Sequence, residues 1–162
     1  MIHLLLSSSI LKKETTLSHW LYKGKPLTEV PQKQFGFVYL ITNLNSSQMY
    51  IGRKYFESKR RKKVKGKKRR TIVRTETDWS TYTGSSKTLN KDIAKTGKDK
   101  FKFEILVLGE TRGQVNYLEE NIHHKFHVVA RDKFYNDCIG PRRFANVRLS
   151  EEVFKSINKL KL

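Results

Sequence analysis

Two short strand-like segments on either side of a turn constrain the fold of this chain most strongly. Residues 35–42 ("FGFVYLIT") and 48–52 ("QMYIG") are rich in β-branched and aromatic side chains, and "NLNSS" between them has the composition of a turn. The pattern predicts an antiparallel hairpin. Tyr39 and Tyr50 fall on its two halves. Taken alone, they are most simply interpreted as cross-strand packing partners.

A dense basic run follows the hairpin. From Arg53 to Arg74 the chain has thirteen Lys or Arg residues and a single acid, Glu57. Self-repulsion predicts a loop here, which orders when an anion neutralises it, although a merely solvated or localisation-type run has the same composition. The whole chain carries 34 Lys and Arg against 15 Asp and Glu, a net charge of +19. Such an excess predicts a polyanionic partner, with nucleic acid as the first candidate.

The remaining elements alternate between helix and strand. Residues 85–97 predict a short helix with Ser85 or Ser86 as N-cap and Gly97 as its end, and "FKFEILVL" (101–108) predicts a third strand. A longer amphipathic helix follows, with apolar side chains at spacings of three and four: Val115, Leu118, Ile122, Phe126 and Val129. We therefore expect an α+β fold, a small three-stranded antiparallel sheet flanked by helices.

The chain is long enough for one compact domain with extensions. We expect an N-terminal appendage (1–34), a main domain (35–140) with the basic insertion 53–74, and a basic C-terminal helical extension (141–162), whose helix is capped by Ser150.

The only cysteine, Cys138, excludes an intrachain disulfide and Cys-rich zinc sites, and fits a reducing cytoplasm. The N-terminal "MIHLLLSSSILKK" lacks a basic start and a cleavage signal and is too short to span a bilayer, so we read it as a buried or frayed segment. The basic run forms neither an amphipathic helix nor a lipid anchor. We therefore expect a cytoplasmic protein without a membrane partner.

The polar face of the longer helix carries a carboxylate and three imidazoles. Glu120 lies about 200° around the helix from Leu118 and points away from the apolar stripe. His123, His124 and His127 follow it at spacings of three, four and seven. Exposed side chains are the simpler interpretation for His123 and His127, whereas His124 is a candidate for contact with phosphate. A di-metal site of the Glu-x-x-His type needs four helices, which this chain does not offer.

These residues together resemble the GIY-YIG nuclease superfamily. "FVY" (37–39) and "YIG" (50–52) are similar to the two halves of its signature, with Phe37-Val38 in place of Gly-Ile. Arg60, ten residues after Tyr50, then Glu120 and finally Asn136 in "FYN" follow in the family's order. Residues 82–106 resemble the middle of phage-type homing endonucleases, and residues 20–43 resemble the leader of endonucleases encoded by large phages. The resemblance spans about residues 20–140.

The resemblance implies a metal-dependent endonuclease that nicks or cuts duplex DNA. Tyr39 would position or deprotonate the attacking water with Tyr50 beside it, and Glu120 would hold one Mg²⁺ or Mn²⁺. Arg60 would favour the phenolate and bind the scissile phosphate, with Arg53 or Arg61 as alternatives, and Asn136 would fix the geometry by hydrogen bonds. A tyrosine with a pKa near 10 is a poor base at neutral pH without such a cation.

The partner implied is DNA, and the protein is expected to be a monomer or a weak homodimer. Two other functions stay open: a noncatalytic basic nucleic-acid-binding protein, in which the tyrosines only pack, and a structure-specific repair or recombination nicker. The side chains expected to contact nucleic acid are basic ones and those of a helix N-terminus. They are Arg53, Lys54, Arg61, Lys62, Lys63, Lys65, Lys67, Lys68, Arg69, Arg70, Ser85, Ser86, Lys87, His124, Arg142 and Arg143.

Overall fold

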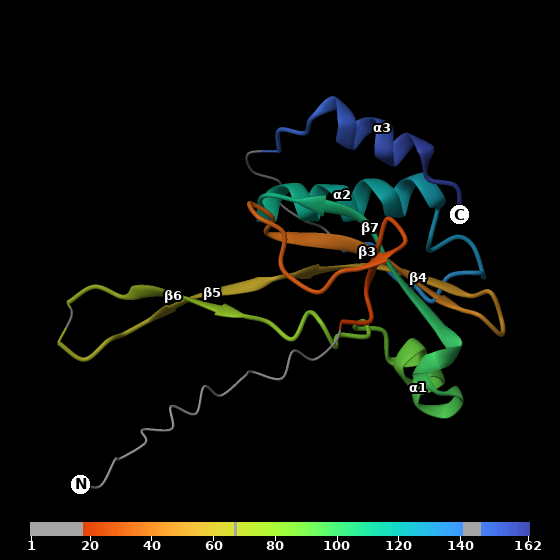
Figure 1. Ribbon diagram of the computed structural model, residues 1–162, viewed down its shortest axis with the longest axis horizontal. Coiled ribbons are helices and arrows are strands. Elements are labelled where there is room, and N and C mark those ends of the chain that lie inside the picture. The colour runs from red at the N-terminus through yellow and green to blue at the C-terminus, as the bar shows by residue number, and fades with distance from the viewer. Residues whose placement is uncertain (1–17, 67, 141–146) are drawn as a thin grey trace, which may run out of the picture.

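The computed structural model describes residues 18–66, 68–140 and 147–162, and it has the expected α+β architecture (Figure 1). Its strands are β1 (Leu21–Tyr22), β2 (Lys25–Pro26), β3 (Gly36–Asn43), β4 (Met49–Tyr55), β5 (Glu57–Lys62), β6 (Thr71–Glu76) and β7 (Phe101–Gly109). Its helices are α1 (Lys87–Thr96), the 3₁₀ turn η1 (Lys98–Lys100), α2 (Arg112–Phe126) and α3 (Glu151–Lys159).

The main sheet is larger than the sequence predicts. It has five strands in the order β2-β1-β7-β3-β4, and within it β7, β3 and β4 form the expected antiparallel unit. The N-terminal strands β1 and β2 extend that unit, with β1 parallel to β7, so the sheet is mixed rather than antiparallel throughout. The anchor of this added hairpin is Trp20, whose fully buried ring packs on Phe37, Tyr39 and Phe103.

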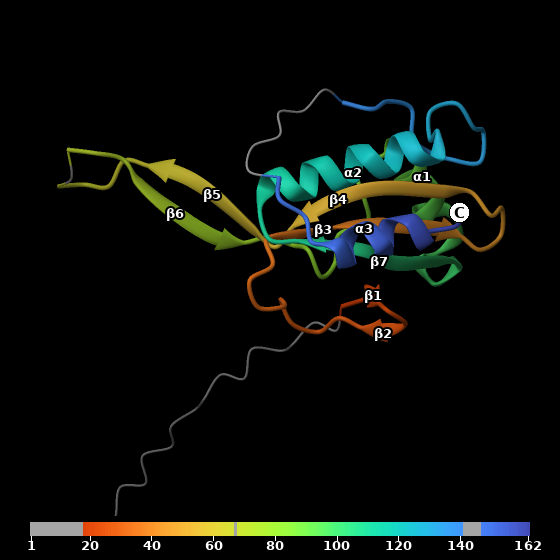
Figure 2. The same cartoon turned by 90° about the horizontal axis from the view of Figure 1, so that it is seen from above.

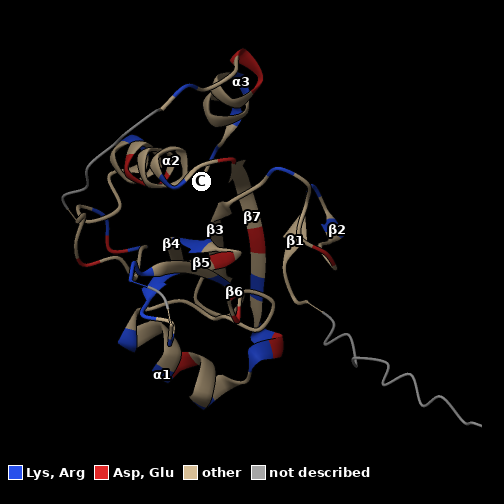
Figure 3. Ribbon diagram, turned by 90° about the vertical axis from the view of Figure 1, so that its left-hand side faces the viewer, with Lys and Arg blue, Asp and Glu red and all other residues tan. Residues whose placement is uncertain are grey.

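Helices cover both faces of the sheet (Figure 3). On one face, the apolar stripe of α2 packs on alternate residues of β3, such as Val38 and Leu40, and α3 adds Ile157 to that layer. On the other face, α1 contributes Leu89 to a second layer, which is built largely from aromatic rings. Strand β4 lies at the edge of the sheet, where residues 133–136 after α2 bond to the backbone of Met49 and Ile51.

A β-bulge interrupts the pairing of β3 with β7 between Val38 and Tyr39. Val38 pairs with Val107 but Tyr39 pairs with Ile105, so one extra residue of β7, Leu106, lies between them. Such bulges change which face successive side chains occupy. The end of this strand is apolar at every position because both of its faces are covered: Leu106 and Val107 contact the layer under α2, and Ile105 and Leu108 contact the aromatic layer.

The basic run is not the loop that the sequence predicts. Residues 57–62 and 71–76 pair as an antiparallel two-stranded sheet, β5–β6, which projects away from the body (Figures 1 and 2). Backbone pairing and the β-branched stretch Thr71–Val73 favour the strands. Glu57 also offsets part of the repulsion, because its carboxylate pairs with Lys59 at 3.2 Å and with Arg74 across the strands at 3.4 Å.

The helix predictions are confirmed with one exception at a helix end. Ser86 caps α1 by accepting a hydrogen bond from Leu89 N, and Ser150 caps α3 in the same way. Helix α2 ends earlier than the apolar pattern suggests, because His127 adopts a left-handed conformation (φ 52°). Val129 therefore lies outside the helix and is 49% exposed, while its neighbour Val128 is fully buried in its place.

Several predicted features fall outside the described residues: the N-terminal segment 1–13, Lys67, Arg142 and Arg143. Within the described part of the chain, no helix combines the length and the apolar character needed to cross a membrane.

Candidate functional site

A pocket of about 650 Å³ lies beside β4. Its walls come from segments far apart in the sequence: β3, β4, the N-terminus of α1, the polar border of α2, and the loop after α2. The residues that line it are Tyr39, Tyr50, Arg53, Lys54, Tyr55, Tyr82, Ser85, Ser86, Lys87, Thr88, Glu119, His123, Asn136, Asp137, Cys138 and Gly140.

The two signature tyrosines meet over a glycine. Tyr39 and Gly52 are direct cross-strand partners, and the Tyr39 ring lies across β4 with its centroid 6.1 Å from that of Tyr50. A Cβ atom on Gly52 would lie 2.5 Å from the Tyr39 hydroxyl and 3.0 Å from the Tyr50 ring. Only glycine therefore lets both rings occupy these positions.

Burial of Tyr39 determines its protonation. The residue is 1% exposed, and burial, followed by the nearby Tyr50 and Tyr82, raises the pKa of its hydroxyl well above 10. Burial also raises the pKa of Tyr50, although a hydrogen bond with Ser85 opposes this. At neutral pH both groups are therefore phenols, which can donate and accept hydrogen bonds, and not phenolates.

Arg53 and Glu119 form an ion pair within the pocket. The guanidinium donates through Nη1 to Glu119 Oε2 and through Nε to the Tyr55 hydroxyl, at 3.0 Å for the latter. Tyr55 in turn donates to Asn116 Oδ1 at 2.5 Å. Burial lowers the pKa of Arg53, but Glu119 and Tyr55 more than offset it and the net shift is upward, so the cation is maintained.

Asn136 and His123 both bind the backbone of Ile51, one residue after Tyr50. Asn136 accepts from Ile51 N at 3.0 Å and donates to Ile51 O at 2.8 Å. His123 Nε2 lies 3.0 Å from the same carbonyl oxygen. Burial lowers the pKa of His123, which favours a neutral imidazole that donates this bond. These bonds hold α2 and the loop that follows it against β4.

The N-terminus of α1 forms the opposite wall. The Tyr50 hydroxyl and Ser85 Oγ are 3.0 Å apart, and Ser86 caps the helix. Free N–H groups and the helix dipole at such a terminus favour an anion, and Lys87 adds a positive charge. This wall suits a phosphate group.

The pocket contains some of the predicted site residues and not others. Tyr39, Tyr50 and Asn136 line it, as do five of the residues expected to contact nucleic acid: Arg53, Lys54, Ser85, Ser86 and Lys87. Arg60 lies on β5, in a separate cavity at the base of the β5–β6 ribbon. Glu120 does not line the pocket, and one of its carboxylate oxygens is buried without a hydrogen-bond partner among the described residues.

The carboxylate that faces the tyrosines is Glu119, the neighbour of the residue that the sequence favours. Asn116, Glu119 and His123 follow one another at helical spacings of three and four, and all three contact β4 or Tyr55 through the bonds above. This polar stripe borders the apolar one, whereas Glu120 lies further around the helix. In the sequence, the carboxylate of the pocket is therefore marked by its position directly beside the apolar stripe, because that side of α2 meets the edge of the sheet.

The two later histidines do not line the pocket. His124 and His127 are exposed, as expected for His127, whereas His123 is buried and not on the solvated face. No group of three or more His, Cys, Asp or Glu side chains is arranged to hold a metal ion in the described ranges 18–66, 68–140 and 147–162.

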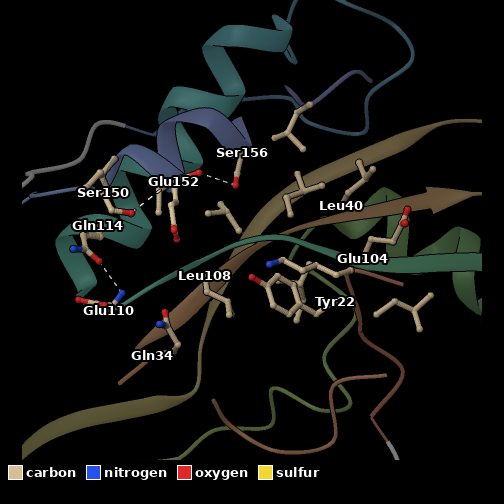
Figure 4. Close-up of a pocket in the computed structure, with 18 of the residues that line it drawn as sticks. Tyr22, Gln34, Leu40, Glu104, Leu108, Glu110, Gln114, Ser150, Glu152 and Ser156 are labelled. Carbon is tan, nitrogen blue, oxygen red and sulfur yellow. Dashed lines mark hydrogen bonds between the residues drawn. The ribbon is translucent and has the colours of Figure 1, made fainter. Parts of the chain in front are cut away.

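A larger cavity of about 900 Å³ lies elsewhere, between β7, the β1–β2 hairpin and α3 (Figure 4). Its walls combine apolar side chains such as Leu108 with three carboxylates and three cations: Glu104, Glu110, Glu152, Lys23, Arg148 and Lys161. The formal charges of this lining balance, and none of the predicted catalytic residues belongs to it. The smaller pocket beside β4 contains Tyr39, Tyr50 and Asn136 and is therefore the candidate functional site.

A family model described as "Putative endonuclease segE, GIY-YIG domain" matches residues 20–139. The match begins at Trp20, so it includes the N-terminal hairpin that completes the sheet, and it ends just after Asn136. No curated protein and no solved structure gives a significant match to the chain.

Proposed function

Since the chain belongs to the segE-type GIY-YIG endonuclease family, we propose that it hydrolyses phosphodiester bonds in DNA with the help of a divalent cation. One observation carries the proposal: two tyrosines, an arginine, a carboxylate and a helix N-terminus line a single pocket beside β4. In-line hydrolysis needs a positioned water and positive charge on the nonbridging oxygens, and this set of groups suits both needs.

We assign the carboxylate role to Glu119 instead of Glu120. Arg53 engages Oε2 of Glu119, which leaves the second carboxylate oxygen for a cation. Mg²⁺ commonly uses one or two protein carboxylates and fills its remaining positions with water and phosphate oxygens, so the donor set fits this ion. When bound, Mg²⁺ or Mn²⁺ would neutralise charge that develops on the scissile phosphate.

The protein's own groups have separate tasks in this proposal. Tyr39 remains protonated because of its raised pKa, so it orients the attacking water by hydrogen bonding instead of removing its proton. Arg53 is the cation of the pocket that pairs with the carboxylate, and its planar fork matches a phosphate. Asn136 keeps β4 in place through Ile51, which makes it a positioning residue.

The experiment compares two neighbouring carboxylates. Supercoiled plasmid is incubated at low salt with Mg²⁺, Mn²⁺ or EDTA and with the wild type, Glu119→Gln or Glu120→Gln. We expect wild-type nicking only with metal, a loss of about 10²-fold or more for Glu119→Gln, and a much smaller loss for Glu120→Gln. A gel shift checks that each variant still binds DNA.

Each other outcome has a definite meaning. If Glu120→Gln loses more activity than Glu119→Gln, the assignment within the helix is wrong. If the wild type binds plasmid and branched DNA but cuts neither, the protein is a noncatalytic binder. Preferential cutting of branched DNA would instead identify a structure-specific nicker.

A further inference from the structure

The β5–β6 ribbon is a preformed arm with a fixed base. Thr77 closes it by donating from its backbone N to Phe56 O at 2.9 Å and from its hydroxyl to Tyr55 O at 2.6 Å. Trp79 adds a bond from Nε1 to Glu76 at 3.0 Å, with its own ring buried in the core. Beyond this base the ribbon leaves the body (Figures 1 and 2). Residues 59–66 and 68–70 are all exposed.

The two faces of the ribbon differ in the charged side chains that they carry. Cross-strand partners share a face, so the register places both acids, Glu57 and Glu76, on the same side as Lys59, Arg61 and Arg74. Glu57 pairs with Lys59 and Arg74, so the charge of these two cations is partly neutralised. We call the opposite side the acid-free face: it carries Ser58, Arg60, Lys62, Thr71, Val73 and Thr75.

The acid-free face holds its cations unpaired. Neither Arg60 nor Lys62 has an ion pair among the described residues. Between them and around them lie hydroxyl groups and one valine, which are short side chains. This composition lets the backbone of the ribbon approach a ligand closely while two cations and three hydroxyls contact it.

The dimensions of the arm suit a particular groove. A two-stranded ribbon fits the major groove of B-DNA, which is about 12 Å wide. The major groove of A-form RNA is too narrow and deep to be read in this way. Six strand residues at about 3.3 Å each extend roughly 20 Å, and that length spans about six base pairs at 3.4 Å per step.

We propose that the acid-free face of the β5–β6 ribbon enters the major groove of duplex DNA on one side of the pocket. Arg60 reaches a base edge there, and Lys62 with the loop cations contacts the flanking phosphates. The inference builds on the proposed DNA-cleaving function, which gives the arm its substrate, but it concerns a surface outside the pocket.

The test uses a duplex with a filled major groove. One 40-base-pair duplex is unmodified, and a second carries a bulky neutral substituent on C5 of its cytosines, which projects into the major groove and leaves the phosphates unchanged. Binding is measured in EDTA with proteins carrying Glu119→Gln, so the DNA stays intact. We expect this protein to bind the modified duplex about 10-fold more weakly than the plain one.

The matched variants remove equal charge from opposite faces. Arg60→Gln/Lys62→Gln should bind the plain duplex more weakly and lose the preference for it. Lys59→Gln/Arg74→Gln, with the same charge removed from the other face, should keep the preference. A minor-groove ligand such as distamycin should compete poorly with either protein.

Three results would overturn the proposal: equal binding of the two duplexes by the parent protein, equal losses for the two double variants, or full competition by an A-form RNA duplex of the same length. Any of these would mean that the ribbon contacts phosphates alone. The outcome is independent of cleavage, because a protein that never cuts DNA can still show or lack this preference.

Discussion

The pocket beside β4 and the β5–β6 ribbon are joined by a few residues yet are built in opposite ways. In the pocket, Tyr39 is almost fully buried and its position depends on the absence of a side chain at Gly52. On the ribbon, no described residue from 59 to 70 is buried. Beyond the base of the ribbon, the positions of these side chains therefore do not depend on packing against the body. Reacting groups must be held in fixed positions by packing, whereas attraction to a polyanion requires only positive charges close to its phosphates.

Removing the ribbon gives the strongest test of this separation. Ser58 and Thr75 are cross-strand partners, so an Asn-Gly turn can replace residues 59–74 and leave the base closed. We expect affinity for DNA to fall by about 10²-fold at moderate salt, with a shallower dependence on salt concentration, since each lost phosphate contact reduces the slope by about 0.9. Gel shifts across a salt series measure both quantities.

Single-turnover cutting at saturating DNA serves as the companion measurement for the shortened protein. It should stay within a few fold of the wild type, because the ribbon contributes no residue to the pocket. A shortened protein that binds well but does not cut would show that the arm belongs to the catalytic machinery.

A methyl group on a glycine should affect the two regions differently. In Gly52→Ala the new Cβ meets the Tyr39 hydroxyl at 2.5 Å, and the buried ring cannot move aside. We expect a loss of about 1–3 kcal/mol of stability, or about 2–4 °C in Tm for each kcal/mol, together with slower cutting. Thermal unfolding and the plasmid assay measure the two effects.

The control for this substitution is Gly66→Ala at the tip of the ribbon. Nothing lies within 4 Å of its new Cβ, although its φ of +85° makes the change mildly strained. Cutting at saturating DNA should persist. Equal effects of the two substitutions on cutting would contradict the contrast between the regions.

The smallest expected effect is a pH dependence of stability from His19, whose ring packs on Trp20 and Phe103. Burial first, and then Lys98, lowers the pKa of His19 to about 4, although a hydrogen bond to Tyr82 O opposes this. Since the unfolded chain takes up the proton near pH 6.5, this contribution to stability is complete above pH 6.5 and is lost as the pH falls toward 4. At pH 5 we expect a cost of about 1 kcal/mol, reduced by the partial exposure of the ring.

His19→Phe isolates this effect, because it retains a ring against Phe103, whose centroid lies 4.1 Å from that of His19. The difference in Tm between pH 7.5 and pH 5 should be about 2–4 °C smaller than in the wild type. If Tm falls by the same amount in both proteins on acidification, His19 is not the group responsible.

The sequence predicts the parts of the fold that rest on local patterns. The hairpin of β3 and β4, the cap at Ser86 and the apolar stripe of α2 all follow from residues close together in the chain. Strand β1 could not be predicted in this way, since two residues carry no periodicity and their pairing with β7 joins distant segments. The sequence does not predict the ribbon, because the expected repulsion between its cations favours a loop, whereas the two strands pair with each other.

The sequence predicts part of the lining of the pocket, and on α2 the lining carboxylate is one residue away from the predicted one. The signature tyrosines and Asn136 are recognisable in the sequence, but Glu119 and Glu120 both lie off the apolar stripe, and only the position of the sheet edge distinguishes them. Arg53 and Arg60 differ for a similar reason: the sequence gives their spacing from Tyr50, but Arg53 lies on β4 and lines the pocket, whereas Arg60 lies on β5 and lines a separate cavity.

The parallel pairing of Leu21 with Glu104 also has a consequence for how the chain folds. Trp20 completes the layer that supports Tyr39, yet its neighbours on β7 are synthesised more than eighty residues later. Contacts between such distant residues form late, because the intervening chain must be ordered first. We therefore expect the nascent protein to remain unable to support Tyr39 until β7 has emerged from the ribosome, so that the first residues of the domain are among the last to reach their places.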